Sequence, residues 1–316
     1  MDWGTLKAGL RVPVMGAPMF LVSAPELVIA QCTAGIVGAF PALNARPAAD
    51  LDRWLEHITA GIAAWSGPWP AAPFAVNLIV HRSNPRLDND LAACIRWRVP
   101  IVVTSLGARP EVNAAVHGYG GLVLHDVIDD RFARKAIAKG ADGLIAVAAG
   151  AGGHAGTLSP FALVQAIRSW FDGPLLLAGA IATGDAVLAA EAMGADLAYV
   201  GSPFIATHEA AASDDYKRMV VAGTAADLLY TPAFSGVAAN YLLASVRAAG
   251  FDVDRLPTGR SLSLADEAGE AKAWRDVWSA GQGIGAVREV VPAHALVERL
   301  VDEYRAARMR LGQGRP

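Results

Sequence analysis

Residues 139–147 read KGADGLIAV, and residues 193–200 read MGADLAYV. In both stretches a glycine closes a helical pattern and a short aliphatic run follows. Glycine is the usual residue where a helix ends in a left-handed conformation. An aliphatic run without alternation is typical of a parallel strand that is buried on both faces. The repeat therefore predicts two copies of one helix–strand unit.

The same unit recurs over the first two thirds of the chain. Helical patterns separate eight short runs rich in Val, Ile and Leu, and we predict strands at residues 12–15, 36–40, 74–80, 101–105, 122–126, 144–148, 175–178 and 197–200, with a final amphipathic helix over 287–310. Eight such units predict an α/β fold, the (β/α)8 TIM barrel. A doubly wound open sheet stays as the alternative, because strand order cannot be read from a sequence.

The pattern changes after the eighth strand. Residues 208–283 contain helical patterns at 233–249 and 264–279 and no aliphatic strand run. We therefore predict two domains. Residues 1–207 and 284–316 form the barrel, and residues 208–283 form a mostly helical cap that is inserted after the eighth strand, over the C-terminal mouth.

Composition excludes several classes of protein. Of 316 residues 53% are hydrophobic and 18% charged, which excludes a disordered chain. A net charge of −3 gives no electrostatic reason to expect nucleic acid or an anionic membrane as partner. No apolar stretch reaches the roughly 20 residues of a membrane-spanning helix. No signal peptide is recognisable, and two lone cysteines, Cys32 and Cys94, fit a reducing compartment, so we expect a cytoplasmic protein.

The loop after the sixth predicted strand carries a histidine among glycines. Residues 149–156 read AGAGGHAG, and the histidine is His154. Glycines let a backbone approach a ligand closely, and imidazole exchanges protons near neutral pH. Because active sites of such barrels lie in the loops that follow the strands, His154 is a candidate catalytic residue. The structural alternative is a tight turn with an incidental histidine.

Two further loops indicate an anion site. Residues 178–181 read AGAI after the seventh strand, and residues 201–204 read GSPF after the eighth. Backbone N–H groups of glycine-rich turns form a cradle for anions, and the loops after strands seven and eight commonly hold a phosphate in barrels. The two loops together predict a phosphorylated ligand.

Asn77 interrupts the apolar strand 74–80. A buried amide is costly unless its donors and acceptor are used, so it either bridges neighbouring strands or binds the polar edge of a flat heteroaromatic ring. The phosphate site favours the ring. His125 and Asp126 end the fifth strand and offer further polar groups at the mouth. No metal-ligand spacing, nucleophile elbow, P-loop or dinucleotide fingerprint is present, so we expect no metal.

Taken in order, these motifs resemble the nitronate monooxygenase family, formerly called 2-nitropropane dioxygenases. The resemblance covers essentially the whole chain and rests on PVMGAPM (13–19), FAVNL (74–78), GGHAG (152–156), AGAI (178–181), GAD (194–196), GS (201–202) and WSAGQG (278–283). It implies an FMN-containing barrel with an inserted cap. The activity that it implies is the oxidation of alkyl nitronates or nitroalkanes by O2 to a carbonyl compound and nitrite.

The resemblance also implies roles for single residues. His154 would be the catalytic residue. The residues that would bind FMN are Pro18, Met19, Asn77, His125, Gly153, Gly179, Ala180, Val200, Gly201 and Ser202. The phosphate would lie on the backbone of the two glycine loops, and Pro18, Met19 and Asn77 would line the isoalloxazine ring. The family often has glycine in place of Ala180 and threonine in place of Ser202. Some relatives have a lysine near the flavin where His125 stands, so its role stays open.

Other functions stay open beside this one. Relatives with the same barrel are NAD(P)H-dependent reductases of quinones or of enoyl-thioesters. A phosphate-sugar isomerase, an aldolase or a binding protein could use the barrel without redox chemistry, although an isomerase usually needs a Lys or Glu at a strand end. The expected partners are a small nitronate or nitroalkane and O2, with NAD(P)H and a homodimer left open.

Overall fold

The computed structural model describes residues 2–256 and 275–312. Its centre is a sheet of eight parallel strands, each within two residues of its predicted bounds: β1 (Val14–Gly16), β2 (Gly38–Pro41), β3 (Phe74–Ile79), β4 (Ile101–Ser105), β5 (Leu122–Val127), β6 (Gly143–Val147), β8 (Leu175–Ala178) and β9 (Leu197–Val200). The prediction of eight parallel strands is confirmed.

The sheet closes into a barrel. Its strand order is β1-β9-β8-β6-β5-β4-β3-β2, so the first and last strands in sequence are neighbours. A parallel bridge between Met15 and Val37 joins β1 to the segment that leads into β2 and closes the ring. An open doubly wound sheet is excluded, because such a sheet has two free edges.

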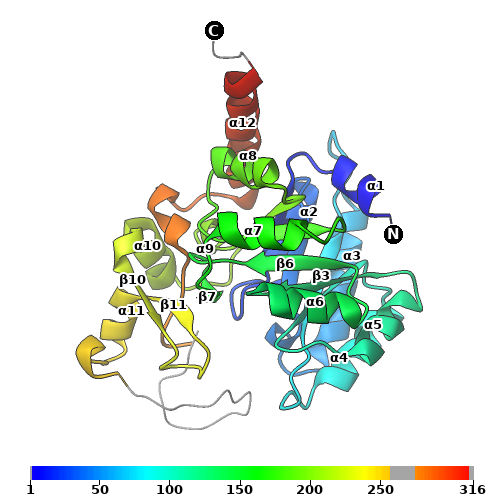
Figure 1. Cartoon of the computed structure of the whole chain (residues 1–316), viewed down its shortest axis with the longest axis horizontal. Coiled ribbons are helices and arrows are strands. Elements are labelled where there is room, and N and C mark those ends of the chain that lie inside the picture. The colour runs from blue at the N-terminus through cyan, green and yellow to red at the C-terminus, as the bar shows by residue number, and fades with distance from the viewer. Residues whose placement is uncertain (1, 257–274, 313–316) are drawn as a thin grey trace.

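Helices surround the strands (Figure 1). The helices are α1 (Trp3–Ala8), α2 (Pro25–Thr33), α3 (Asp50–Ala63), α4 (Leu87–Arg96), α5 (Pro110–His117), α6 (Asp130–Ala138), α7 (Pro160–Arg168), α8 (Gly184–Met193), α9 (Ser202–Ile205) and α12 (Ala293–Gly312), with a 3-10 turn at Ala42–Asn44. Alternate strand residues fill the barrel, as Met15, Leu124 and Leu176 do. The residues between them pack against the helices, so the strands are apolar on both faces.

The repeated GAD sequence has the same structural role in both copies. Gly140 and Gly194 have positive φ angles of 90° and 108° and end α6 and α8. The aspartate two residues later accepts a hydrogen bond from the start of the preceding strand. Asp142 Oδ2 bonds to Val123 N at 2.7 Å, and Asp196 Oδ2 bonds to Leu175 N at 2.9 Å. Each repeat therefore ends a helix and ties two adjacent strands together.

The segment after β9 differs from the predicted helical cap. Its described part holds α10 (Asp214–Ala222), α11 (Leu243–Ala248) and the 3-10 turns Ala225–Asp227, Val253–Arg255 and Gln282–Ala286, but also the strands β10 (Leu228–Thr231) and β11 (Ala239–Leu242). These two strands form a hairpin, and β11 also pairs with β7 (Gly153–His154) in the loop that follows β6. In Figure 1 this yellow hairpin lies beside one end of the barrel.

Two predicted helices in this part of the chain need correction. The helix predicted over 233–249 is wrong in its first half, because residues 239–242 form a strand and the helix begins only at Leu243. Alanines there favour a helix locally, but pairing with β7 and β10 overrides that preference. Most of the helix predicted over 264–279 lies outside the described residues, and 275–279 is not helical. The final helix begins at Ala293 and not at 287.

Helix α12 packs closely on α8 at Gly184. A Cβ atom built on Gly184 would lie 2.5 Å from Leu300 O and closer still to Tyr304 N. The Gly184 amide donates to Glu303 Oε2 at 2.7 Å. The C-terminal helix is therefore fixed on the barrel by backbone contact, which a side chain at position 184 would prevent.

We expect Gly184→Ala to lower the free energy of unfolding by about 3 kcal/mol or more, because neither backbone atom can move without separating the two helices. Gly285→Ala is the matched control, since a Cβ there meets nothing within 4 Å. Urea unfolding of both variants measures the difference. Equal stability of the two variants would contradict the close packing of α8 and α12.

Candidate active site

The C-terminal ends of the barrel strands surround one large cavity of about 1510 Å³. Loops that follow β1, β3, β4, β5, β6, β8 and β9 line it, together with the hairpin residues Phe234, Ser235 and Val237. Ten of the eleven predicted site residues line this cavity, and Val200 does not. The ten are Pro18, Met19, Asn77, His125, Gly153, His154, Gly179, Ala180, Gly201 and Ser202. Val200 is fully buried, and its carbonyl accepts a 2.8 Å hydrogen bond from Ala17 N. This bond fixes the loop that carries Pro18 and Met19.

His154 is held by the hairpin, an arrangement that the sequence did not reveal. It pairs with Ala239 in the small antiparallel sheet. Its Nε2 lies 2.9 Å from Ser235 Oγ, and the Ser235 hydroxyl donates to Val237 O at 2.9 Å. Because Ser235 has one hydrogen, it accepts from His154, so the imidazole proton is on Nε2 and Nδ1 carries the basic lone pair.

Burial keeps the His154 imidazole neutral. The pKa of His154 is lowered to about 4, with desolvation as the cause. Tyr241 supports the arrangement, since its hydroxyl lies 3.3 Å from Ser235 Oγ and its ring is fully buried. At neutral pH His154 can therefore accept a proton or a hydrogen bond, but it does not supply a positive charge.

Asn77 both bridges strands and presents a group to the cavity. Its Nδ2 donates to Val103 O at 3.2 Å and to Ser105 Oγ at 2.7 Å, so β3 is tied to β4. Both amide hydrogens are used in these bonds. The group left for a ligand is the Asn77 carbonyl oxygen, an acceptor that suits a ring N–H.

The fifth strand places Asp126, and not His125, toward the barrel interior. Leu124 belongs to the interior layer, and strand residues alternate, so Asp126 shares its side. His125 is buried between strands and helices, and its Nδ1 lies 2.6 Å from Thr104 Oγ1. Burial lowers the pKa of His125 to about 4, and the charge of Lys139 contributes. Alternation along this strand was the available signal, and Tyr199 on β9 faces the cavity by the same rule.

The two glycine loops form a backbone cradle. Gly179 has a φ of 143°, and a Cβ built there would lie 2.8 Å from Ala149 O. Ala180 has a φ of 56°, which is unusual for a residue other than glycine. Its amide donates to Gly150 O at 3.2 Å. Ser202 Oγ accepts from Gly281 N at 2.7 Å, so the cradle meets the segment 279–283.

The cradle fits a phosphate group by its chemistry. Turn amides and one hydroxyl are the donors that bind phosphate in such loops, and the absence of a side chain at Gly179 and Gly201 leaves the backbone accessible. The Ala180 amide can serve a ligand only if it shares or releases Gly150 O. A metal is not expected here, and the described residues contain no group of three His, Cys, Asp or Glu placed to hold one.

The fold and this cavity define a TIM-barrel enzyme with a site large enough for a cofactor and a substrate. The chain belongs to the nitronate monooxygenase family, a family of flavin-dependent oxidoreductases, whose family model matches residues 5–303. The family resemblance seen in the sequence is thereby confirmed.

Known proteins of several activities are similar to this chain. A nitronate monooxygenase of Paraburkholderia phytofirmans is 28% identical over 83% of this chain and 82% of its own length. A carboxyl-CoA dehydrogenase of Rhodococcus jostii is 26% identical over 69% of this chain and 59% of its own length. The solved structure of a nitroalkane oxidase from Streptomyces ansochromogenes has a TM-score of 0.79 at 26% identity, over 97% of this chain and 99% of that chain. The activities named for these similar proteins differ.

None of the described helices is both long and apolar enough to span a membrane. The large apolar residues that are exposed include Ile128 and Phe132, which border the cavity mouth.

The buried histidines predict a loss of stability in acid. Between a pKa of about 4 in the folded protein and 6.5 in the unfolded chain, the unfolded chain binds more protons, so the free energy of unfolding falls as the pH falls. We expect His125→Asn to reduce this fall by roughly 2 kcal/mol between about pH 6.5 and 4.5. Urea unfolding at a series of pH values measures it.

An exposed histidine on α3 provides the control for this prediction. His57→Asn is the matched variant, because it removes an imidazole that is exposed and not buried in the folded protein. If the free energy of unfolding falls with pH equally in His125→Asn and the wild type, the buried, neutral state of His125 is contradicted.

Proposed function

We propose that the protein is an FMN-dependent oxidoreductase that oxidises alkyl nitronates, or nitroalkanes, with O2 to a carbonyl compound and nitrite. One observation carries the proposal: a neutral, partly buried His154 lines the cavity of a chain that belongs to the nitronate monooxygenase family. Related nitronate monooxygenases along most of the chain support the same substrate class.

The cavity residues divide into a phosphate end and a ring end. We assign the FMN phosphate to the backbone of Gly179, Ala180 and Gly201 with the Ser202 hydroxyl. Pro18, Met19 and Asn77 would border the ring, where the Asn77 oxygen accepts from a ring N–H. When bound, FMN supplies the redox chemistry, while the protein positions it and the substrate.

His154 has two roles in this proposal. Its Nδ1 lone pair accepts the α-proton of a neutral nitroalkane, and for a nitronate it serves as a hydrogen-bond partner that orients the substrate. Ser235 holds the imidazole through Nε2 and selects the tautomer. Ser235 of the hairpin therefore determines which ring nitrogen of His154 acts as the base.

We also propose that residues 208–283 form the unit that covers the substrate, while residues 1–207 and 284–316 form the FMN-binding barrel. Several described contacts support this division. Phe234 and Ser235 line the cavity, and Tyr230 Oη donates to Ala155 O at 2.7 Å. The stacked rings of Tyr216 and Trp278, 4.9 Å apart, hold the segment 279–283 near the cradle. Such a cover excludes water from the reacting atoms.

Two loop variants test the cofactor site. We expect Gly179→Ala to abolish FMN binding, because its Cβ would meet Ala149 O at 2.8 Å and its φ of 143° strains any side chain. Ala180→Gly should retain FMN and raise the free energy of unfolding by about 1 kcal/mol, since it relieves a left-handed residue. The FMN content after dialysis and the urea midpoint are the measurements. If Gly179→Ala retains FMN, the assignment of the phosphate to this loop is wrong.

Anaerobic absorbance of the FMN-loaded protein tests the donor class. Adding a small alkyl nitronate should change the flavin spectrum, and air should reverse the change with release of nitrite. We expect His154→Asn to keep FMN and to lower turnover by about 10²–10⁴-fold, with a smaller fall for Ser235→Ala. Tyr230→Phe is the control, since it removes a hydroxyl of the neighbouring strand β10 that bonds to Ala155 O and not to His154. Unchanged turnover in His154→Asn would refute its catalytic role.

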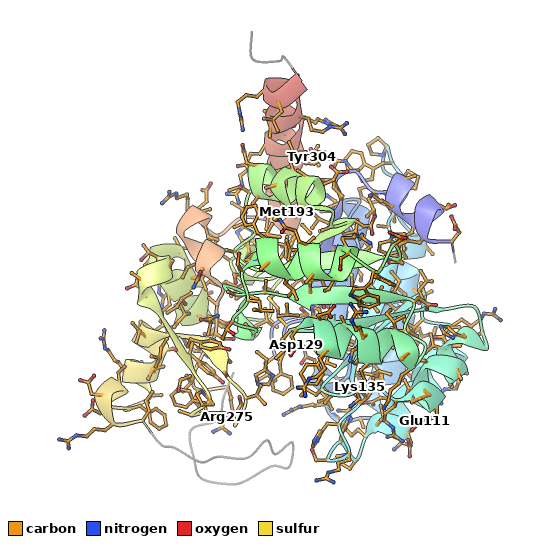
Figure 2. The ribbon with its side chains drawn as sticks, in the orientation of Figure 1. Glu111, Asp129, Lys135, Met193, Arg275 and Tyr304 are labelled. Carbon is orange, nitrogen blue, oxygen red and sulfur yellow. The ribbon has the colours of Figure 1, made fainter. Side chains whose placement is uncertain are left out.

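An NAD(P)H-dependent flavin reductase, with a quinone or enoyl-thioester acceptor, is the second candidate. The observation that favours it is the basic lining of a cavity larger than a small nitronate needs. Arg46, Lys135 and Arg275 border the cavity, and Figure 2 labels Lys135 on α6 and Arg275 beside the hairpin. Among the described lining residues Asp126 is the only acidic one. A yellow protein that ignores nitronate but is reduced by NADH or NADPH would favour this function.

A further inference from the structure

The side chain of Asp126 lies on the interior side of the barrel near the C-terminal end of β5. The function proposed above does not use this carboxyl group. Asp126 borders the cavity. Its Oδ1 is shielded from solvent and has no hydrogen-bond partner among the described residues. A shielded carboxylate oxygen without a donor is a costly place for negative charge.

The other carboxylate oxygen is fixed by a chain of hydrogen bonds from three strands. Asn77 Nδ2 donates to Ser105 Oγ at 2.7 Å, and the Ser105 hydroxyl donates to Asp126 Oδ2 at 2.5 Å. Because the single Ser105 hydrogen is used on Oδ2, a proton that reaches Asp126 binds at Oδ1. The chain thus leaves one defined position for proton uptake.

Among the described residues no cation is paired with Asp126, although Lys135 lines the same cavity. Tyr199 on β9 has a shielded hydroxyl without a partner among the described residues, and burial, with the charge of Asp126 second, raises its pKa. Ile145 is the residue of β6 that pairs with Asp126. Two titratable residues that line the same cavity, His125 and His154, have pKa values lowered to about 4, so both are neutral at pH 7.

We propose that Asp126 is the proton acceptor that balances charge when the flavin in this cavity is reduced. This inference rests on the proposed FMN site, whose ring end includes Asn77, the first member of the hydrogen-bond chain. Electrons that enter the cavity add negative charge near an ionised carboxylate whose Oδ1 is shielded from solvent. Protonation of Asp126 removes the negative charge of the carboxylate and so the repulsion between it and the reduced ring.

The step is balanced as follows. A reductant, either the substrate or dithionite, gives up two electrons to the ring. One proton from water binds the ring, and a second proton from water binds Asp126 Oδ1, converting its carboxylate to a carboxylic acid. Burial already raises the pKa of Asp126 to about 6, against the Ser105 hydrogen bond, and a reduced ring raises it further. Above pH 6 Asp126 is therefore mostly ionised before reduction, and it takes up a proton on reduction as long as the pH lies below its raised pKa.

Potentiometric titration of the FMN-loaded protein between about pH 6.5 and 8.5 tests the proposal. The wild type should take up two protons per two electrons, and Asp126→Asn should take up one. For each pH unit, the equilibrium constant for reduction should therefore change by a factor that is about ten-fold smaller in the variant than in the wild type. Glu111→Gln, which removes an exposed carboxyl outside the cavity, should behave as the wild type.

A second variant and a second signal keep the test decisive. Ser105→Ala removes the hydrogen bond that lowers the Asp126 pKa. The pH range in which two protons are taken up per two electrons should therefore begin at higher pH in this variant. This test remains available if Asp126→Asn binds FMN poorly. Infrared difference spectra of the wild type should show a carboxylic acid C=O band on reduction, and Asp126→Asn should lack it. Equal proton uptake in wild type and Asp126→Asn, or an unshifted range in Ser105→Ala, overturns the role of Asp126. Failure of the wild type to bind FMN would instead overturn the proposed function.

Discussion

Closure of the parallel sheet is the constraint on which the rest of the structure depends. Because β1 pairs with β9 and reaches β2 through the Met15–Val37 bridge, every strand has two neighbours and all strands end at one rim. Residues far apart in sequence, such as Asn77 and Ser202, meet around one cavity only for this reason. Small features maintain the closure, among them the aspartates of the two GAD repeats and the tight contact of α8 with α12.

The second organising contact is the pairing of β7 with β11. It turns a glycine-rich loop into an edge strand of a small sheet and fixes His154 against Ser235. The glycines then have a clear purpose, because Gly152 and Gly281 approach so closely that a Cβ on Gly152 would lie 2.8 Å from Gly281 N. The site is thus built at a junction between the barrel and the segment that follows its last strand.

The electrostatics of the cavity follow from burial. His125 and His154 are neutral because desolvation disfavours the imidazolium, and Asp126 holds its charge weakly for the same reason. Basic residues also line the cavity, and one of them, Arg46, lies over the ring of Phe20. A neutral base and a carboxyl with a raised pKa, both lining one cavity, suit chemistry in which electrons and protons move together.

The sequence by itself determined the eight strands, their parallel α/β arrangement and most of the cavity lining, because aliphatic runs between glycine-ended helices form buried parallel strands. It favoured the barrel, but closure was decided only by the pairing of β1 with β9 and the Met15–Val37 bridge, which exclude the open sheet. It also singled out His154, Asn77 and the two glycine loops. It could not supply Ser235 or the β10–β11 hairpin, since the alanine-rich segment favours a helix until β7 offers a partner. Nor could it decide which of His125 and Asp126 faces the barrel interior, which depends on the register of β5. These features are long-range contacts, and only the tertiary structure decides them.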